Sequence, residues 1–417
     1  MDSVPKNQNT VIVASGTGPS PALAVEALPP VEAFALLLEQ VFPDVATPLE
    51  FLGGVDPELR GLLVERLGLV ETGPGVVRFL HVLIRGYDPR LRLAALGALG
   101  KHNSEIPEVA EAWFDLATYQ VNEATSLAAK RAISGGSHDL AMQWRVPALR
   151  PAVQPVRGLV TAMDGTGRAL MGLLAEGGGK WVGAVFDCDV ELGVVQVGGV
   201  EGPERLGALG YLEDRLLNSS RDLCDGTAGL AVELLRAALT QVGPSSPPAL
   251  GYWVERVCGK GVTPARLRSP APLRPGGHDS PRIMADHAVE LLDALPGWWE
   301  DDPLTESLAS EAVLRVADPG DDPGAIRILF ERRLVHRLER YRRMLTWMGV
   351  YWYASKEPMF SQLAFEFAAQ LDDPQNAVPR HPWIAEYARR SLRLAGERQV
   401  NAARVASGLS AYKRPEG

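Results

Sequence analysis

The sequence predicts a mainly α-helical protein with a small α+β module near its middle. Apolar residues follow a helical spacing up to Ser134 and again in the last third of the chain. Between these regions, short glycine turns separate runs rich in β-forming residues. A chain of 417 residues, 46% of them hydrophobic, is sufficient for two or three domains with cores of their own.

Changes in composition divide the chain into five segments. The first, residues 1–29, is polar and without a period, which predicts a disordered tail. The other boundaries follow prolines and glycines. We expect helical repeats over 30–146, the α+β module over 156–261, a Pro/Gly-rich linker over 262–282 and a helical domain of TPR-like hairpins over 283–417.

An internal repeat lies in the first helical segment. One copy begins at Asp56-Pro57, the next begins 32 residues later at Asp88-Pro89, and a fainter third copy begins at Asn122. An aspartate at the N-cap accepts hydrogen bonds from free backbone N–H groups, and proline fits the first turn. Each Asp-Pro pair therefore predicts the start of a helix, and Gly68 and Gly100 its end.

The second copy, residues 88–100, resembles the second helix of HEAT repeats in its Asp, Leu-Arg and Ala-Leu-Gly positions. The resemblance extends over roughly 55–135 and implies helix pairs stacked side by side through small alanine faces. Such an array binds partners on a surface and not in a deep pocket. The alternative for this segment is a helical bundle without repeats.

The middle of the chain predicts an antiparallel β-meander. The expected strands are Leu159–Met163, Ala169–Ala175, Trp181–Asp187 and Gly193–Val197. Short connections such as Asp164-Gly165-Thr166-Gly167 are typical of hairpins. We expect helices over 203–217 and 227–241 to cover one face of this sheet.

Three aspartates in this module are candidates for catalysis. Asp187 and Asp189 follow an apolar run, and with Cys188 they resemble the Asp-X-Asp motif of haloacid-dehalogenase-like phosphatases. Asp164 and its glycines resemble the first phosphate loop of actin-like ATPases. Hairpin turns explain all three aspartates without a ligand. The enzyme alternative is therefore a phosphatase-like or metal-dependent hydrolase that uses these carboxylates.

Basic residues are concentrated near the start of a long helix expected from Leu334 to Trp352. They are Arg332, Arg333, His336, Arg337, Arg340, Arg342 and Arg343. Guanidinium groups bind carboxylates and phosphates in a bidentate manner, so these residues could bind a partner. Alternatively, they form a solvated face paired with Glu331 and Glu339.

Earlier in the chain, Trp298 and Trp299 are adjacent and expected on a helix, so they cannot both face one core. At least one of the two should lie at a domain boundary or a binding surface.

Charge and cysteine content restrict the function classes. The net charge of -9 argues against a general nucleic-acid binder, because that class usually carries a basic excess. Three widely spaced cysteines predict neither a metal site nor a disulfide framework, and we expect a reducing cytoplasm. We expect no membrane span and no cofactor.

Taken together, these patterns favour a non-enzymatic protein-interaction or scaffold subunit that acts through helical surfaces within a complex. The alternatives are the enzyme described above and a nucleic-acid-associated factor that uses the arginines. The candidate partner-binding residues are Arg332, Arg333, Arg337, Arg340, Arg343, Trp298 and Trp299.

Overall fold

A computed structural model describes residues 31–102, 106–118, 123–135, 153–219, 221–259, 262–267, 281–295, 297–372 and 381–406. The chain divides into two compact units. The first comprises Met1–Val160 and Leu170–Arg266, and the second comprises Thr161–Ala169 and Leu267–Gly417. The expected tail 1–29, the residue Asn122 and the end of the chain from Ser407 lie outside the described residues.

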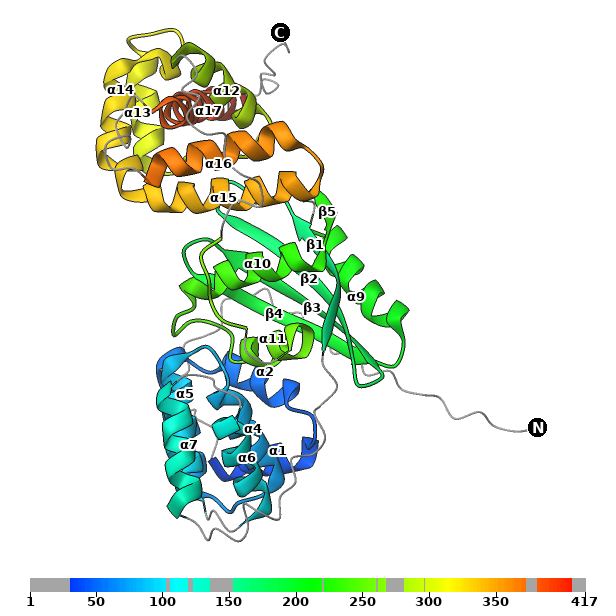
Figure 1. Ribbon diagram of the computed structural model, residues 1–417. Helices are drawn as coiled ribbons and strands as arrows, with labels where there is room; N and C mark the ends of the chain where they lie inside the picture. The colour runs from blue at the N-terminus through cyan, green and yellow to red at the C-terminus, as the bar shows by residue number, and fades with distance from the viewer. Residues whose placement is uncertain are drawn as a thin grey trace, which may run out of the picture. The chain divides into compact units, whose positions relative to one another are not determined.

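The first unit begins with helices only (Figure 1). They are α1 (Val31–Val41), α2 (Ala46–Gly54), α3 (Pro57–Arg66), the 3-10 helix η2 (Leu67–Leu69), α4 (Pro74–Ile84), α5 (Pro89–Leu99), α6 (Pro107–Thr118) and α7 (Glu123–Gly135). Helices α4 and α5 form one pair and α6 and α7 the next, while α4 also packs on α1 and α6, and α3 on α5. The helical fold is confirmed, whereas the HEAT-like repeat stays a prediction.

The Asp-Pro pairs begin helices, as predicted. The Asp56 carboxylate accepts a hydrogen bond from the Glu58 backbone N–H (2.8 Å), and Asp88 accepts from Arg90 (2.8 Å). Glycine has a different role at Gly68, because a Cβ there would lie 2.9 Å from the Cα atom of Ala98. Gly68 thus permits the close approach of η2 to α5.

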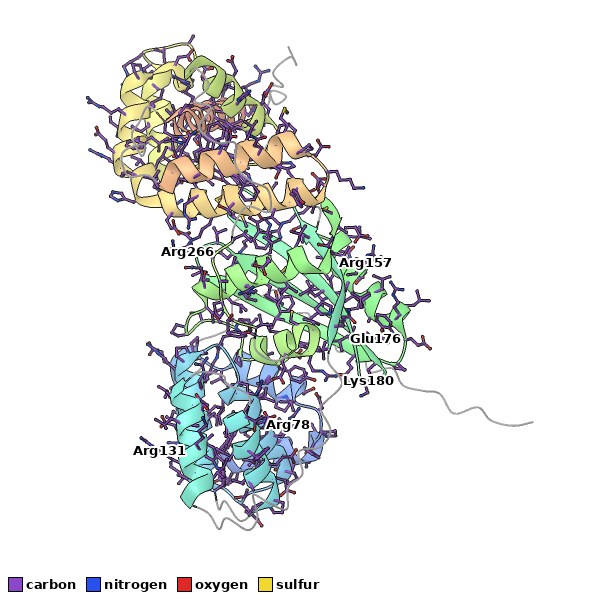
Figure 2. The ribbon with its side chains drawn as sticks, in the orientation of Figure 1. Arg78, Arg131, Arg157, Glu176, Lys180 and Arg266 are labelled. Atoms are coloured by element: carbon purple, nitrogen blue, oxygen red, sulfur yellow. The ribbon has the colours of Figure 1, made fainter. Side chains whose placement is uncertain are left out.

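The α+β module follows in the same unit. Its elements are β1 (Gln154–Thr161), β2 (Arg168–Gly177), β3 (Lys180–Asp189), β4 (Gly193–Gly202), α9 (Arg205–Leu217), β5 (Leu223–Gly226), α10 (Ala228–Ala238), the 3-10 helix η3 (Leu239–Gln241) and α11 (Leu250–Cys258). The strand order is β4-β3-β2-β1-β5, and the antiparallel meander is confirmed. Arg157 on β1, labelled in Figure 2, forms ion pairs with Asp225 on β5 (2.8 Å) and Glu213 on α9 (3.3 Å).

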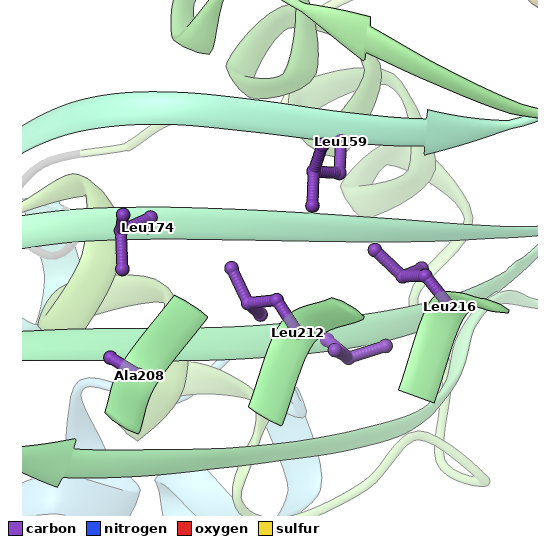
Figure 3. Packing of buried hydrophobic residues seen from close by; sticks show 6 residues of the cluster. Leu159, Leu174, Ala208, Leu212 and Leu216 are labelled. Carbon is purple, nitrogen blue, oxygen red and sulfur yellow. The ribbon is translucent and has the colours of Figure 1, made fainter. Parts of the chain in front are cut away.

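Helices cover both faces of the sheet, and the prediction that α9 and α10 share one face is wrong. Leu159 packs in a cluster with Leu212 and Leu216 of α9 (Figure 3). At the preceding residue, Gly158, a Cβ would meet Ala231 of α10 at 2.6 Å. Because successive residues of a strand point to opposite faces, α9 and α10 lie on opposite sides.

A buried polar network joins the N-terminal helices to this module. Arg85, the residue after α4, donates to Glu255 on α11 (2.9 Å) and to Asp115 on α6 (3.2 Å), and Asp115 also pairs with His81 (2.8 Å). Burial lowers the pKa of His81. Tyr87 donates to the carbonyl of Val262 (2.9 Å), so the start of the expected linker is packed against the unit.

The second unit is helical apart from the β1–β2 turn. Its helices are α12 (Pro281–Asp293), α13 (Pro303–Val313), the 3-10 helix η4 (Pro319–Asp321), α14 (Pro323–Arg332), the 3-10 helix η5 (Leu334–Arg337), α15 (Leu338–Ala354), α16 (Pro358–Asp372) and α17 (Pro382–Ala406). Helix α17 contacts α12, α13 and α14, and α15 pairs with α16 (Figure 1). The unit is therefore helical, as predicted, with α17 packed on three other helices, whereas the TPR-like character of its hairpins stays a prediction.

Candidate functional site

The arginine-rich segment does not lie on one helix, contrary to the sequence prediction. Arg332 ends α14, Arg333 lies between α14 and η5, and Arg337 ends η5. Only Arg340, Arg342 and Arg343 belong to α15. The backbone changes direction at Arg333, where φ is -131° and ψ is -61°. This change directs three of the arginines toward one carboxylate.

That carboxylate is Glu300, which is 2% exposed and lies between α12 and α13. Arg337 donates from Nη1 to Glu300 Oε2 (2.8 Å). The Arg333 Nε atom lies 3.5 Å from Oε2, and the Arg340 Nη1 atom 3.9 Å from Oε1. Asp302 forms a second ion pair with Arg333 (2.9 Å). Glu300 thus satisfies the requirement that a buried charge be paired and hydrogen-bonded.

Two tyrosines complete the surroundings of Glu300. The Tyr341 hydroxyl donates a short hydrogen bond to Oε1, and the Tyr387 hydroxyl donates to the same atom (3.5 Å). Burial, and then the nearby negative charge, raise the pKa of both phenols well above 10. Both hydroxyls therefore stay protonated and act as donors at neutral pH.

The remaining basic residues lie at the surface around this cluster. Arg342 and Arg343 pair with Glu339 (2.6 and 2.8 Å), as the solvated-face interpretation predicts. These bonds, the one from Arg342 first, lower the pKa of Glu339 to about 2. Arg332 and His336 are exposed.

The two tryptophans precede α13 and are not on a helix. Trp298 is 1% exposed, and its Nε1 donates to the carbonyl of Met163 in the β1–β2 turn (2.9 Å). Trp298 is therefore a core residue of the second unit, and its prediction as a surface contact is wrong. Trp299 is half-buried, with the Arg398 guanidinium 5.9 Å from its ring centre.

The turn that contains Asp164 is built as a hairpin turn. The Asp164 carboxylate accepts from the Thr166 N–H (2.9 Å), the Thr166 hydroxyl (2.6 Å) and the Arg168 N–H (3.0 Å). A Cβ on Gly165 would lie 1.8 Å from the carbonyl oxygen of Gly297. Glycine is required there by packing within the second unit, and the aspartate holds the turn in shape.

The other two candidate aspartates lie on β3 of the first unit. Asp189 accepts from the backbone N–H groups of Glu191 (2.8 Å) and Leu192 (3.0 Å), which is a turn-forming role. Cys188 is buried, and burial raises the pKa of its thiol. The antiparallel sheet also differs from the parallel sheet that the phosphatase resemblance implies. Asp164 and the Asp187–Asp189 pair belong to different units.

Across the described ranges no three His, Cys, Asp or Glu residues lie together in a way that could hold a metal ion. Nor does any helix within them have the length and apolar character to cross a bilayer.

Two neighbouring helices of the first unit, α3 and α5, carry exposed residues that the sequence did not single out. Leu93 on α5 is 69% exposed, and Leu62 on α3 is 39% exposed. Gly97 lies one turn after Leu93, and Gly61 lies beside Leu62. A Cβ added at either glycine would meet no atom of the described residues within 4 Å. Each helix thus carries an exposed leucine and a glycine with open space above it.

Packing among the described residues does not explain these two glycines. Glycine inside a helix destabilises it by about 1 kcal/mol relative to alanine. At Gly68 close packing accounts for the glycine, whereas Gly207 and Gly210 on α9 have open space above them, as Gly61 and Gly97 have. The α3 and α5 glycines differ from those of α9 in that they lie on two helices that pack on each other.

Comparisons of this chain with protein-family models, with curated proteins and with solved structures found no match. The geometry of the chain therefore carries the functional proposals.

Proposed function

We propose that this protein is a non-enzymatic protein-interaction subunit of a larger complex, and that it binds a helix of its partner across α3 and α5. The observation that carries the proposal is the combination of exposed Leu62 and Leu93 with Gly61 and Gly97, above which no atom of the described residues lies within 4 Å of a built Cβ.

Physical reasoning connects this surface to a helical partner. Glycines on a helix face allow another backbone to approach closely, and the flanking leucines supply the apolar area that association needs. An amphipathic helix that lies across a shallow apolar face uses side chains spaced at i, i+3, i+4 and i+7. Two adjacent helices offer more width for such contacts than one.

The test is recovery of the partner by tagged full-length protein from its native host, quantified for variants. Gly97→Met places a long side chain where the partner helix would approach, and Leu93→Asp removes an apolar anchor. We expect both to lower recovery of the same partner at least tenfold, which is the effect of about 1.4 kcal/mol.

Helix α9 supplies matched controls in the same unit. Its Leu206 is 78% exposed, and Gly210 also has open space above it. Leu206→Asp and Gly210→Met should leave recovery unchanged. If the α9 variants abolish recovery and the α5 variants do not, the proposed surface is incorrect.

A further pair of variants addresses the enzyme alternative. Asp187→Ala and Asp189→Ala should leave partner recovery at the wild-type level, because neither residue contributes to α3 or α5. Loss of recovery in these variants, with the fold intact by circular dichroism, would count against the proposal.

A further inference from the structure

We infer that the partner helix proposed above carries basic side chains along the edge that lies over α3 and acidic side chains along the edge that lies over α5. This partner chemistry rests on the proposed function, because it concerns the same two helices of the first unit. It follows from the direction of the two helices and from four exposed charges beside the seam where they meet.

Helices α3 and α5 pack on each other and run in the same direction. Near their starts, Arg60 donates to the carbonyl of Ser246 (3.5 Å), and Ser246 lines a small pocket together with Asp88, the N-cap of α5. Near their ends, a Cβ on Gly68 would lie 2.9 Å from the Cα atom of Ala98. Start therefore lies beside start and end beside end, so the helices form a parallel pair with one seam between them.

Each helix carries a glycine between exposed charges of a single sign. The residues are Glu58, Gly61 and Glu65 in the acidic line of α3, and Arg90, Gly97 and Lys101 in the basic line of α5. The spacing is i, i+3, i+7 in the acidic line and i, i+7, i+11 in the basic line, which keeps each line within about 60° around the helix axis. Lys101 follows α5, but its N–H bonds the carbonyl of Ala98 (3.1 Å) and so continues the last turn.

Both lines border the seam. Gly68, which meets α5, follows Gly61 by two helical turns, so the two glycines lie on the same side of this segment. The Cβ built on Gly68 would also lie 2.9 Å from the Cδ atom of Lys101, which places the end of the basic line against the end of α3. Arg66, another exposed charge of α3, lies about 140° around the axis from Gly61 and therefore points away from the seam.

The four charged side chains of the two lines have no ion-pair or hydrogen-bond partner among the residues that the structure describes. A partner of uniform charge would be attracted by one line and repelled by the other. A helix with one basic and one acidic edge is attracted by both, and complementarity of this kind selects the partner more than it adds affinity. Turned end to end, such a helix exchanges its edges, so the charges also fix its direction.

The experiment uses three synthetic helical peptides of about 18 residues, or five turns, that share one leucine and alanine face. The two-sign peptide has lysines along one edge of that face and glutamates along the other. The lysine peptide has lysines along both edges, and the glutamate peptide has glutamates along both. Fluorescence anisotropy measures their binding to the full-length protein at low ionic strength. We expect the two-sign peptide to bind about tenfold more tightly than the other two, and this preference to shrink as salt is added.

Charge reversal in either line should change the preference in a direction that the line predicts. Arg90→Glu should weaken binding of the two-sign peptide about fivefold and strengthen binding of the lysine peptide. Glu65→Lys should weaken binding of the two-sign peptide to a similar extent and strengthen binding of the glutamate peptide. Arg266→Glu is the matched control, because it makes the same charge change at an exposed residue of the same unit, next to the Ala265 N–H that bonds Arg236 of α10 (3.0 Å). It should leave all three affinities unchanged.

Three results would overturn this partner chemistry: no binding of the two-sign peptide, equal binding of all three peptides, or an equal loss in Arg266→Glu. Gly97→Met separates these failures from a failure of the proposed function. If the peptides bind equally and Gly97→Met abolishes their binding, the α3–α5 surface stands and only the charge pattern is wrong. If the two-sign peptide binds Gly97→Met as tightly as the wild type, it binds elsewhere and the proposed surface is incorrect. If no peptide binds, the partner recovery described above decides the surface by itself.

Discussion

Two glycines inside the sheet and two glycines on helices α3 and α5 have opposite surroundings. At Gly183 on β3, a Cβ would lie 2.6 Å from the backbone oxygen of Ala208, and at Gly172 on β2 it would lie 2.9 Å from Leu216. At Gly61 and Gly97, the same atom would meet no described atom within 4 Å. Other parts of the chain fill the space at the first pair, and the described residues leave it open at the second.

This difference separates residues that serve the fold from residues that are available for another molecule. In the sheet, glycine lets α9 approach the strands, and the gain in packing offsets its conformational cost. On α3 and α5 glycine has the same conformational cost, but no gain in packing among the described residues offsets it. The comparison is therefore the physical basis for the proposed partner surface, and it can be tested by substitution.

The largest effect should come from Gly183→Ala. The new methyl group would clash with backbone of α9 and force the helix away from the sheet, so we expect a loss of about 2 to 3 kcal/mol in the free energy of unfolding. Urea unfolding of the full-length protein measures it. Gly202→Ala, at the end of β4 where the space is open, is the control and should change stability little. Equal losses in both variants would remove the distinction.

A pH titration extends the comparison to a buried histidine, of which only one ring nitrogen has a hydrogen-bond partner among the described residues. His381 precedes α17, and its Nδ1 accepts a hydrogen bond from the Ile384 N–H (3.4 Å). Its Nε2 is buried without a hydrogen-bond partner among the described residues. Burial lowers the pKa of His381 to about 4.

The unfolded chain, with a histidine pKa of about 6.5, therefore binds a proton at a higher pH than the folded chain. The stabilisation is complete above pH 6.5 and is lost as the pH falls toward 4, up to about 3 kcal/mol. His381→Asn keeps a hydrogen-bond acceptor at the start of α17. This variant should lose the part of the pH dependence of the unfolding free energy that comes from His381. The exposed His336→Asn should retain the wild-type slope, measured by urea unfolding at several pH values.

The smallest effect has the opposite sign. Gly97→Ala adds a methyl group to open space and raises helix propensity, so we expect a gain of about 0.5 to 1 kcal/mol in the free energy of unfolding. Thermal unfolding of the full-length protein should show a higher midpoint. A loss of stability would mean that Gly97 serves the fold, and the comparison with the sheet would fail.

Local signals explain which elements the sequence predicted well. Asp-Pro pairs begin α3 and α5, and also α13 and α14, because the cap is formed within three residues of the aspartate. Because Asp-Pro pairs begin helices in both units, such a pair does not identify one repeat family. The strand ends beside the hairpin turns were predicted to within two residues, because glycine turns fix them. The start of β1 and the end of β4, which are not at such turns, were each missed by five residues, and β5 was not predicted.

The candidate sites were predicted less well, since they depend on contacts between distant residues. The apolar spacing ran from Leu334 into α15 as if on one helix, and it did not reveal that Leu334–Arg337 form the separate 3-10 helix η5. Nothing in the local sequence of Glu300 indicates that arginines 33 to 40 residues later converge on it. A helix glycine likewise looks the same in sequence whether a neighbour fills the space above it or not.

The sequence by itself determined the helices, the hairpins and their caps, because these depend on backbone propensity and on hydrogen bonds between near neighbours. The tertiary structure alone decided which face of the sheet each helix covers, which arginines are held by Glu300 and which glycines remain uncovered. Those features arise from packing between segments far apart in the chain, and no pattern within a single segment encodes them.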